Sequence, residues 1–167
     1  LLRSTQNTKD QLAIKNQNNA QGFPSLTGKL LDFQNLTYLT ELYLQDNALE
    51  GTIPSTFLMN SASKNDSTIY VGLSRNQLSG TVSADLSDLE HLLIALDDNN
   101  ITGIDSSLCR KKTWMQGNVA KYGCDAILCP AGYYQKFSGR QTTDGLPCSE
   151  CLLTGGAPYM GSTSCVD

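Results

Sequence analysis

Apolar and polar positions alternate along the chain in a frame that recurs three times. The first copy reads Leu42-x-Leu44-x2-Asn47-x-Leu49-x-Gly51, and the next two begin at Val71 and Ile94. This alternation predicts short strands with one buried side at 42–44, 71–73 and 94–96. With a fainter copy ahead of them, the closing glycines stand at 28, 51, 80 and 103, in steps of 23, 29 and 23 residues. Such self-similarity indicates coils that bury their apolar edges against one another.

The asparagine and glycine of each copy have distinct roles. We expect the side chains of Asn47, Asn76 and Asn99 to bond the backbone where the chain turns, forming a ladder between coils. Glycine permits the turn that follows. Amphipathic helices are the alternative, but this alternation followed by Asn and Gly disfavours them. The long step places an insertion in the loop Ser55–Thr68.

Residues Leu36–Pro54, with the frame LxxLxxLxLxxNxLxGxIP, resemble the plant-type leucine-rich repeat of secreted and receptor-ectodomain proteins of plants and algae. The resemblance implies an α/β leucine-rich repeat solenoid, with short parallel strands on one face and irregular, 3-10 or helical turns on the other. Ile14, Asn16 and Asn18 suggest a degenerate first coil. No cysteine precedes Cys109, so the paired-cysteine N-terminal cap of that family is missing. We expect either that the chain continues a longer solenoid or that another chain covers its first coil.

The six cysteines all follow residue 108. An even count in the last third of an acidic chain indicates disulfides made in an oxidising compartment. Six cysteines allow fifteen pairings, of which we favour the sequential one: Cys109–Cys124, Cys129–Cys148 and Cys151–Cys165. Four of them, at 124, 129, 148 and 151, could instead bind zinc, but their spacing is loose and two thiols would be left over. A redox pair at 148 and 151 lacks the expected strand and helix around it.

The segments Cys129–Tyr134, Cys148–Cys151 and Gly161–Cys165 resemble the small cysteine-rich modules of ephrin-receptor-like and tumour-necrosis-factor-receptor-like ectodomains. Joined to plant-type repeats, they resemble secreted or cell-surface proteins of diatoms and related algae. We therefore expect a solenoid at 1–108, a C-terminal cap at 109–128 with Trp114 as its apolar plug, and a cysteine-rich module at 129–167. Reduction should unfold this module before the repeats, because it has almost no core.

Composition narrows the choice of function. The 167 residues include 12 Lys and Arg against 16 Asp and Glu, for a net charge of −4, so nucleic acid is excluded as a partner. The longest apolar run, Leu92–Leu96, is far shorter than the roughly twenty residues of a membrane span, although a longer parent protein could be anchored. The start, Leu1–Thr5, predicts that a secretory signal is absent or removed. His91 is the single histidine, which disfavours triad catalysis, and we predict no catalytic residue, metal or cofactor.

Three N-x-[ST] sequons, at Asn35, Asn65 and Asn100, are candidate glycosylation sites. Asn65 lies in the polar insertion and is the one we most expect to carry glycan. Together with the disulfides, these sequons favour a secreted or cell-surface location.

Side chains that flank the inward leucines project from the strands on the concave side of a solenoid, a surface that we call the strand face. Tyr43 and Tyr70 are aromatic anchors, with Arg75 beside them. The predicted contact residues are Glu41, Tyr43, Gln45, Asp46, Tyr70, Ser74, Arg75, Asp97 and Asp98. We interpret the chain as an extracellular, non-enzymatic module that binds a protein, with or without glycans. The alternative is a structural or accessory subunit of a larger assembly, held through the solenoid ends and the cysteine-rich module. A face that is simply solvated also fits the pattern.

Overall fold

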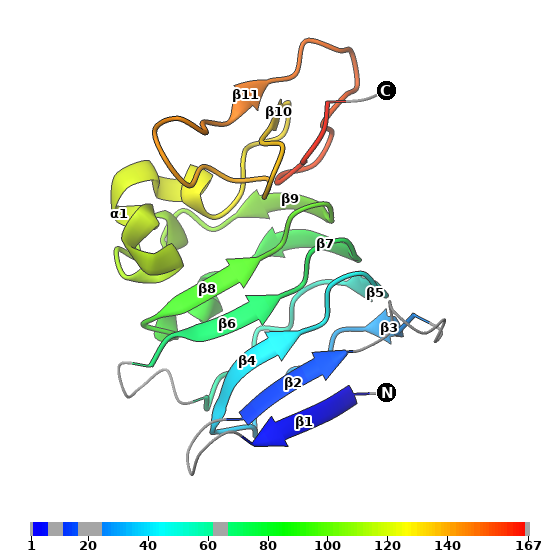
Figure 1. Cartoon of the computed structure of the whole chain (residues 1–167), viewed down its shortest axis with the longest axis vertical. Coiled ribbons are helices and arrows are strands. Elements are labelled where there is room, and N and C mark those ends of the chain that lie inside the picture. Colours follow the sequence, from blue (N-terminus) through cyan, green and yellow to red (C-terminus); the bar gives the residue numbers. More distant parts are fainter. Residues whose placement is uncertain (1, 7–11, 17–24, 62–66, 166–167) are drawn as a thin grey trace.

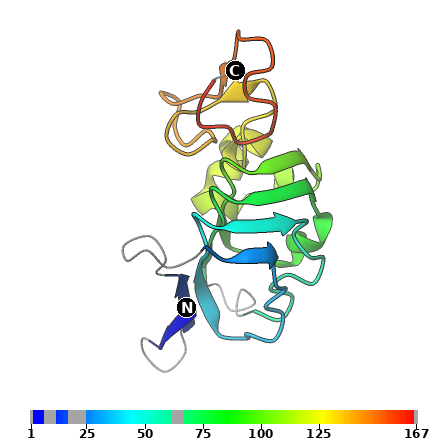
Figure 2. The same ribbon diagram turned by 90° about the vertical axis from the view of Figure 1, so that its right-hand side faces the viewer.

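The computed structural model describes residues 2–6, 12–16, 25–61 and 67–165. Successive coils stack into a solenoid of about three turns, followed by an irregular region with three disulfides (Figures 1 and 2). The predicted fold class is confirmed. Little of the described chain is helical, because most residues of the repeats lie in strands and tight turns.

The three strands with the repeated LxL pattern belong to a five-stranded sheet, called here the front sheet. Its parallel part runs from β2 through β8, with Leu42 opposite Val71 and Val71 opposite Ile94. The inward residues of each copy therefore form continuous rows under the sheet. In spatial order the strands are β1 (Leu2–Gln6), β2 (Leu12–Asn16), β4 (Leu39–Tyr43), β6 (Ile69–Gly72) and β8 (Leu92–Ala95).

The other side of the coils carries a second, parallel sheet, which the sequence pattern did not predict. Its strands are β3 (Thr27–Lys29), β5 (Ala48–Gly51), β7 (Gln77–Val82) and β9 (Asn100–Ile104). These strands contain the repeated glycines, and Gly51 and Gly80 have positive φ values of 79° and 80° that suit glycine. A 3-10 helix, η3 (Ala84–Asp88), follows β7 and is capped by the Ser83 hydroxyl.

The ladder expected from the repeated asparagines is present. The Asn76 side chain accepts the backbone N–H of Leu49 at 3.0 Å and donates to the Leu44 and Leu73 carbonyls at 2.9 and 3.0 Å. Asn47 and Asn99 likewise accept a backbone N–H from the coil before them, that of Leu26 and of Leu78, and donate to the carbonyls of Leu44 and Leu73. All three side chains are buried. Each asparagine therefore satisfies buried backbone groups of its own coil and of its neighbour.

The front sheet ends at β1, which runs antiparallel to β2. Strand β2 itself runs parallel to β4, with Ile14 opposite Leu42. Asn18 lies outside the described residues. The parallel stacking of the front sheet thus stops at a hairpin, with no cysteine involved.

Four short helices cover the other end of the solenoid: η4 (Leu108–Arg110), η5 (Trp114–Gly117), α1 (Asn118–Tyr122) and η6 (Gly123–Ala126). Trp114 is fully buried and belongs to the same core as the leucines. Its indole Nε1 donates to the Leu89 carbonyl at 2.6 Å. The expected apolar plug is therefore in place, and a disulfide joins Cys109 to Cys124 around it.

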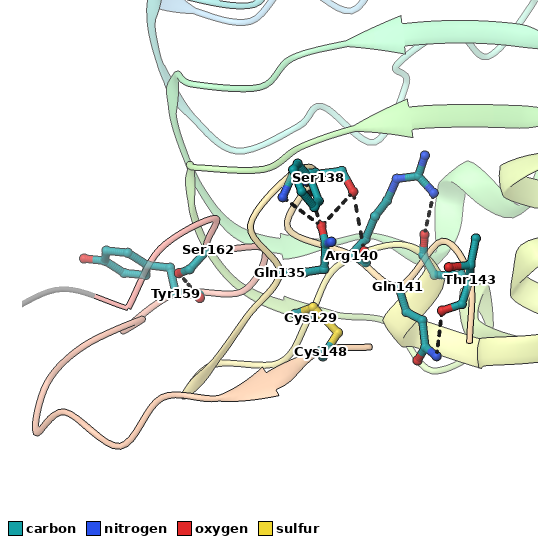
Figure 3. The surroundings of a disulfide bond; sticks show 11 residues. Cys129, Gln135, Ser138, Arg140, Gln141, Thr143, Cys148, Tyr159 and Ser162 are labelled. Atoms are coloured by element: carbon teal, nitrogen blue, oxygen red, sulfur yellow. Dashed lines mark hydrogen bonds between the residues drawn. A yellow bond between two sulfur atoms is a disulfide. The ribbon is translucent and has the colours of Figure 1, made fainter. Parts of the chain in front are cut away.

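Residues 129–165 are the described part of the expected cysteine-rich module. They contain a two-stranded ladder of β10 (Tyr133–Tyr134) and β11 (Ser149–Glu150), and the disulfides Cys129–Cys148 and Cys151–Cys165. The pairing along the whole chain is thus the sequential one. Near Cys129–Cys148 (Figure 3), the buried Gln135 side chain accepts bonds from the backbone N–H and the hydroxyl of Ser138 at 2.9 and 3.1 Å.

Candidate protein-binding face

The register of the front sheet sets outward-facing residues of neighbouring coils side by side. Glu41 lies opposite Tyr70, and Tyr43 lies opposite Gly72. Beyond the carboxyl ends of the strands, the backbone N–H of Asp46 donates to the backbone carbonyl of Ser74, and that of Arg75 donates to the backbone carbonyl of Asp97. The predicted contact residues therefore come close together on the strand face, along β4, β6 and β8 and the turns that follow these strands.

The aromatic anchors form a pair. The ring centroids of Tyr43 and Tyr70 lie 4.7 Å apart, with their planes inclined by 36°. Burial first, and the Glu41 carboxylate next, raise the pKa of the Tyr43 hydroxyl above its ordinary 10.0. Burial and then the Asp97 carboxylate raise the pKa of Tyr70. Both phenols are therefore protonated at neutral pH, and each can donate a hydrogen bond.

An ion-paired cluster lies at the carboxyl ends of the strands. The Arg75 guanidinium bonds both carboxylate oxygens of Asp46, through Nε and, at 2.8 Å, through a terminal nitrogen. It also lies 3.9 Å from the Asp97 carboxylate. The hydrogen bond from Arg75 lowers the pKa of Asp46, and burial raises the pKa of Asp97 above its ordinary value. The pKa values of the two carboxylates in this cluster are therefore shifted in opposite directions.

The backbone itself positions three of these side chains. Asp46, Arg75 and Asp98 occupy the same slot of the repeat, one residue before the ladder asparagine, and have φ values of 59°, 53° and 53°. L-residues other than Asn and Asp adopt this left-handed region reluctantly, so Arg75 is the unusual one. The common geometry stacks the three side chains in one column, with Arg75 between two acids.

The cysteine-rich module continues this column. The backbone N–H of Asp98 donates to the Gly161 carbonyl at 3.1 Å, as that of Arg75 does to Asp97. The Asp98 carboxylate accepts the backbone N–H and the hydroxyl of Thr163 at 2.9 and 2.7 Å. Ser162 is in turn bridged in parallel to Tyr134 of β10. Gly161–Thr163 therefore acts as a further rung of the solenoid.

Arg140 approaches the strand face from the same module. The backbone before it packs on Asp97, because a Cβ added to Gly139 would stand 2.9 Å from the Asp97 Cβ atom. The guanidinium is bonded to the Ala126 carbonyl at 3.5 Å (Figure 3). Burial lowers the pKa of Arg140, while the charge of Asp97 raises it. Neither Arg140 nor Thr163 was among the predicted residues, because nothing in the repeat pattern links the strand face to residues so far along the chain.

Two predicted contact residues are not available to a partner. Ser74 and Asp97 are only 7% and 6% exposed, and the Ser74 hydroxyl donates to the Asp97 carboxylate at 2.5 Å. We expected both side chains to project into solvent, and the structure shows them buried instead. Arg75 and the cysteine-rich module lie against Asp97, which explains its burial.

The remaining predicted sites fall in different places. Asn35 is exposed before β4, Asn100 is half-buried at the start of β9, and Asn65 lies outside the described residues. All six cysteines are in disulfides. In the part of the chain that the structure describes, no group of three His, Cys, Asp or Glu side chains is arranged to hold a metal ion. No helix among the described residues has the length and hydropathy of a membrane span.

Residues 38–59, which contain the first clear repeat, match the family model described as Leucine Rich Repeat. The match supports a leucine-rich repeat protein, and solenoids of this kind are typically non-enzymatic folds that bind proteins. Comparison with curated proteins and with solved structures gives no match.

Proposed function

We propose that this chain is an extracellular module that recognises a protein partner through the strand face. The observation that carries the proposal is the pair of tyrosine rings, Tyr43 and Tyr70, set 4.7 Å apart on adjacent strands. Tyrosine and arginine are the residues most often found at the centre of protein interfaces, since they offer large rigid area with a polar tip. Arg75 lies in the turn that follows β6, where its guanidinium is hydrogen-bonded to the Asp46 carboxylate.

The proposed location rests on the disulfides and sequons. Three disulfides in residues 109–165 are consistent with folding in an oxidising compartment. The exposed Asn35 supports glycosylation, which we propose also for Asn65 and Asn100. Plant-type repeats of algal kind, with a receptor-like module after residue 129, are the finer form of this proposal. Intact-mass measurement before and after glycosidase treatment tests it, and an unchanged mass would exclude the glycans.

The test of recognition uses the full chain as bait. Replacing both Tyr43 and Tyr70 by Ala should abolish capture of a partner from the extracellular fraction of the source cells, because it removes the aromatic centre of the face. The matched control replaces Tyr38 and Tyr159, two exposed tyrosines outside the strand face. Equal capture by both double variants, with circular dichroism showing that both are folded, would reject the strand face as the binding surface.

A structural role in an assembly is the second candidate. It is favoured by apolar side chains that the cysteine-rich module leaves in solvent, led by Leu152 at 87% and Phe137 at 70% exposure. Isolated apolar residues are ordinary on a surface, but several on a small module indicate contact with another chain. Sedimentation of the full chain tests this role, with Leu152→Ser and Phe137→Ser expected to dissociate any oligomer. A monomer at all concentrations would count against it.

A further inference from the structure

An apolar hollow lies beside β3, which is the outermost strand of the second sheet. Its volume is about 230 Å³. A cavity of about 150 Å³ with walls of this kind is large enough to bind benzene. The exposed fraction of Leu31 in its lining is 65%, so the hollow is open to solvent at this side chain. Six lining residues are apolar: Leu26, Leu30, Leu31, Phe33, Leu44 and Leu49.

The charges near the hollow do not favour an ionic ligand. Lys29 is the one charged residue of its lining, and it stands opposite Glu50 in the second sheet. The Asp32 carboxylate, on the segment between two lining residues, accepts bonds from the Gln34 amide and the Thr56 hydroxyl at 2.9 and 3.2 Å. Burying a charged group against six apolar side chains is costly. The occupant that fits is therefore an uncharged, apolar side chain.

The cysteine-rich module presents two such side chains on a braced turn. Leu152 and Leu153 lie just after β11, and their exposed fractions are 87% and 48%. The backbone N–H of Gly156 donates to the Leu153 carbonyl at 3.1 Å, and Gly155 has a φ of 85°. The Cys151–Cys165 disulfide closes the loop that carries this turn. We call residues 152–156 the leucine turn; because it is braced, little conformational entropy is lost when its leucines are buried.

The leucine turn and the apolar hollow match in chemistry but lie at different ends of the molecule. Residues 151–165 contain no charged side chain. Strands β5, β7 and β9 separate β3 from the module, which bonds the solenoid at Ile101 of β9. Figure 1 accordingly shows the segment after β11 at the end of the molecule farthest from β1. An apolar projection at one end and a pocket at the other can meet between two copies, in a head-to-tail contact.

We propose that Leu152 and Leu153 of one copy insert into the apolar hollow of a second copy. This inference rests on the structural role proposed above as the second candidate, and it names the partner as the chain itself. The contact joins two different surfaces, so every pair keeps one free hollow and one free leucine turn, and assembly continues. Neither surface includes Tyr43 or Tyr70, which leaves the strand face out of the contact.

The test uses full chains with opposite defects. Replacing Leu152 and Leu153 by Ser removes the apolar turn and keeps the hollow. Leu31→Asp places a charge at the hollow and keeps the turn; Thr27→Asp, at a second exposed lining residue, does the same if the first variant fails to fold by circular dichroism. In sedimentation velocity the wild type should form a concentration-dependent series beyond the dimer, and each variant should associate about tenfold more weakly. The matched control is Gln116→Asp, an equal charge at an exposed residue of η5.

Mixing the two defective variants is the decisive measurement. An equimolar mixture should form heterodimers and nothing larger, because one intact turn and one intact hollow remain to meet. A mixture that stays monomeric while the wild type assembles would overturn the inference, as would wild-type oligomers that Leu31→Asp leaves intact; the structural role would then stand with a different contact. A wild type that is monomeric at all concentrations would reject both, while recognition through Tyr43 and Tyr70 would be untouched.

Discussion

Between Leu30 and Leu128 the chain buries leucine, isoleucine and valine side chains from every coil, together with Trp114, in one core. Between residues 129 and 165 the buried apolar side chains of the described chain are those of Cys129 and Ala157. The first region is stabilised by burial and by the asparagine ladder, and the second by two disulfides and the Gln135 turn. A segment that is too small to form a core needs covalent crosslinks in its place.

The two regions nevertheless share one hydrogen-bonded edge. Gly161 and Thr163 bond Asp98 where the next coil of the solenoid would do so, and Met160 donates to the Ile101 carbonyl at 2.9 Å. The cysteine-rich module is therefore docked as a terminal rung, although its own stability has a different origin. The two regions are expected to respond differently to loss of core, loss of crosslink and loss of the shared edge.

The largest expected effect comes from the plug of the solenoid. Trp114→Ala removes a fully buried side chain and leaves the Leu89 carbonyl without its indole donor. We expect the free energy of unfolding to fall by about 3–5 kcal/mol. Urea unfolding followed by circular dichroism measures it, with the exposed Tyr38→Ala as the control. A loss comparable to that of the control would show that the core does not depend on the plug.

Removing a crosslink should affect mainly the other region. Replacing Cys129 and Cys148 by Ser opens a loop with a sequence separation of 19, and should destabilise the cysteine-rich module by about 3 kcal/mol in the chain-entropy model. Hydrogen exchange read by mass spectrometry should accelerate across 130–165 and stay unchanged in β6. Equal acceleration in β6 would mean that the two regions unfold as one unit.

A break in the ladder should weaken the solenoid alone. Asn76→Ala leaves the buried N–H of Leu49 without an acceptor and two carbonyls without one of their donors. The expected loss is about 2 kcal/mol, from the unpaired groups. Urea unfolding compares it with Gln77→Ala, the exposed neighbour in β7. Similar stability of the two variants would show that water replaces the ladder at no cost.

The sequence was sufficient for the parts of the fold that rest on local repetition. The spacing of leucine, asparagine and glycine specifies the inward rows and the ladder, because each residue serves the same purpose in every coil. It did not show the second sheet, because the repeated glycines that lie in its strands were assigned to turns. It did not show the antiparallel β1 either, because no repeated residue marks that pairing. The candidate site was predicted where it follows the repeat, as with Tyr43 and Tyr70. It was missed where it depends on contacts distant in sequence, as with Arg140 and Thr163.

The shared edge can be weakened without touching either core. Thr163→Val keeps the shape of the side chain and removes the hydroxyl that donates to Asp98, while the backbone bond remains. We expect the docked edge to lose about 1 kcal/mol of stability, which should be measured as faster hydrogen exchange at residues 160–163. Ser164→Ala, at the exposed next residue, is the control. Unchanged exchange would show that backbone bonds alone dock the module.

The smallest effect concerns pH and the two carboxylates around Arg75. Burial raises the pKa of Asp97 above its ordinary 3.8, so its stabilising contribution is present below that pH and is lost as the pH rises through the native-state pKa. The Arg75 bond lowers the pKa of Asp46, so the contribution of Asp46 is present above 3.8 and is lost as the pH falls through its native-state pKa.

The corresponding variants should therefore differ from the wild type on opposite sides of that pH. Relative to the wild type, Asp97→Asn should gain stability as the pH rises above 3.8, since the amide has no charge to desolvate. Asp46→Asn should be less stable at neutral pH, and this deficit should shrink as the pH falls. Urea unfolding at a series of pH values measures both. If the free energy of unfolding of Asp97→Asn and of the wild type changed with pH in the same way, the Asp97 carboxylate would have to be solvated. That result would contradict its burial beneath the docked cysteine-rich module.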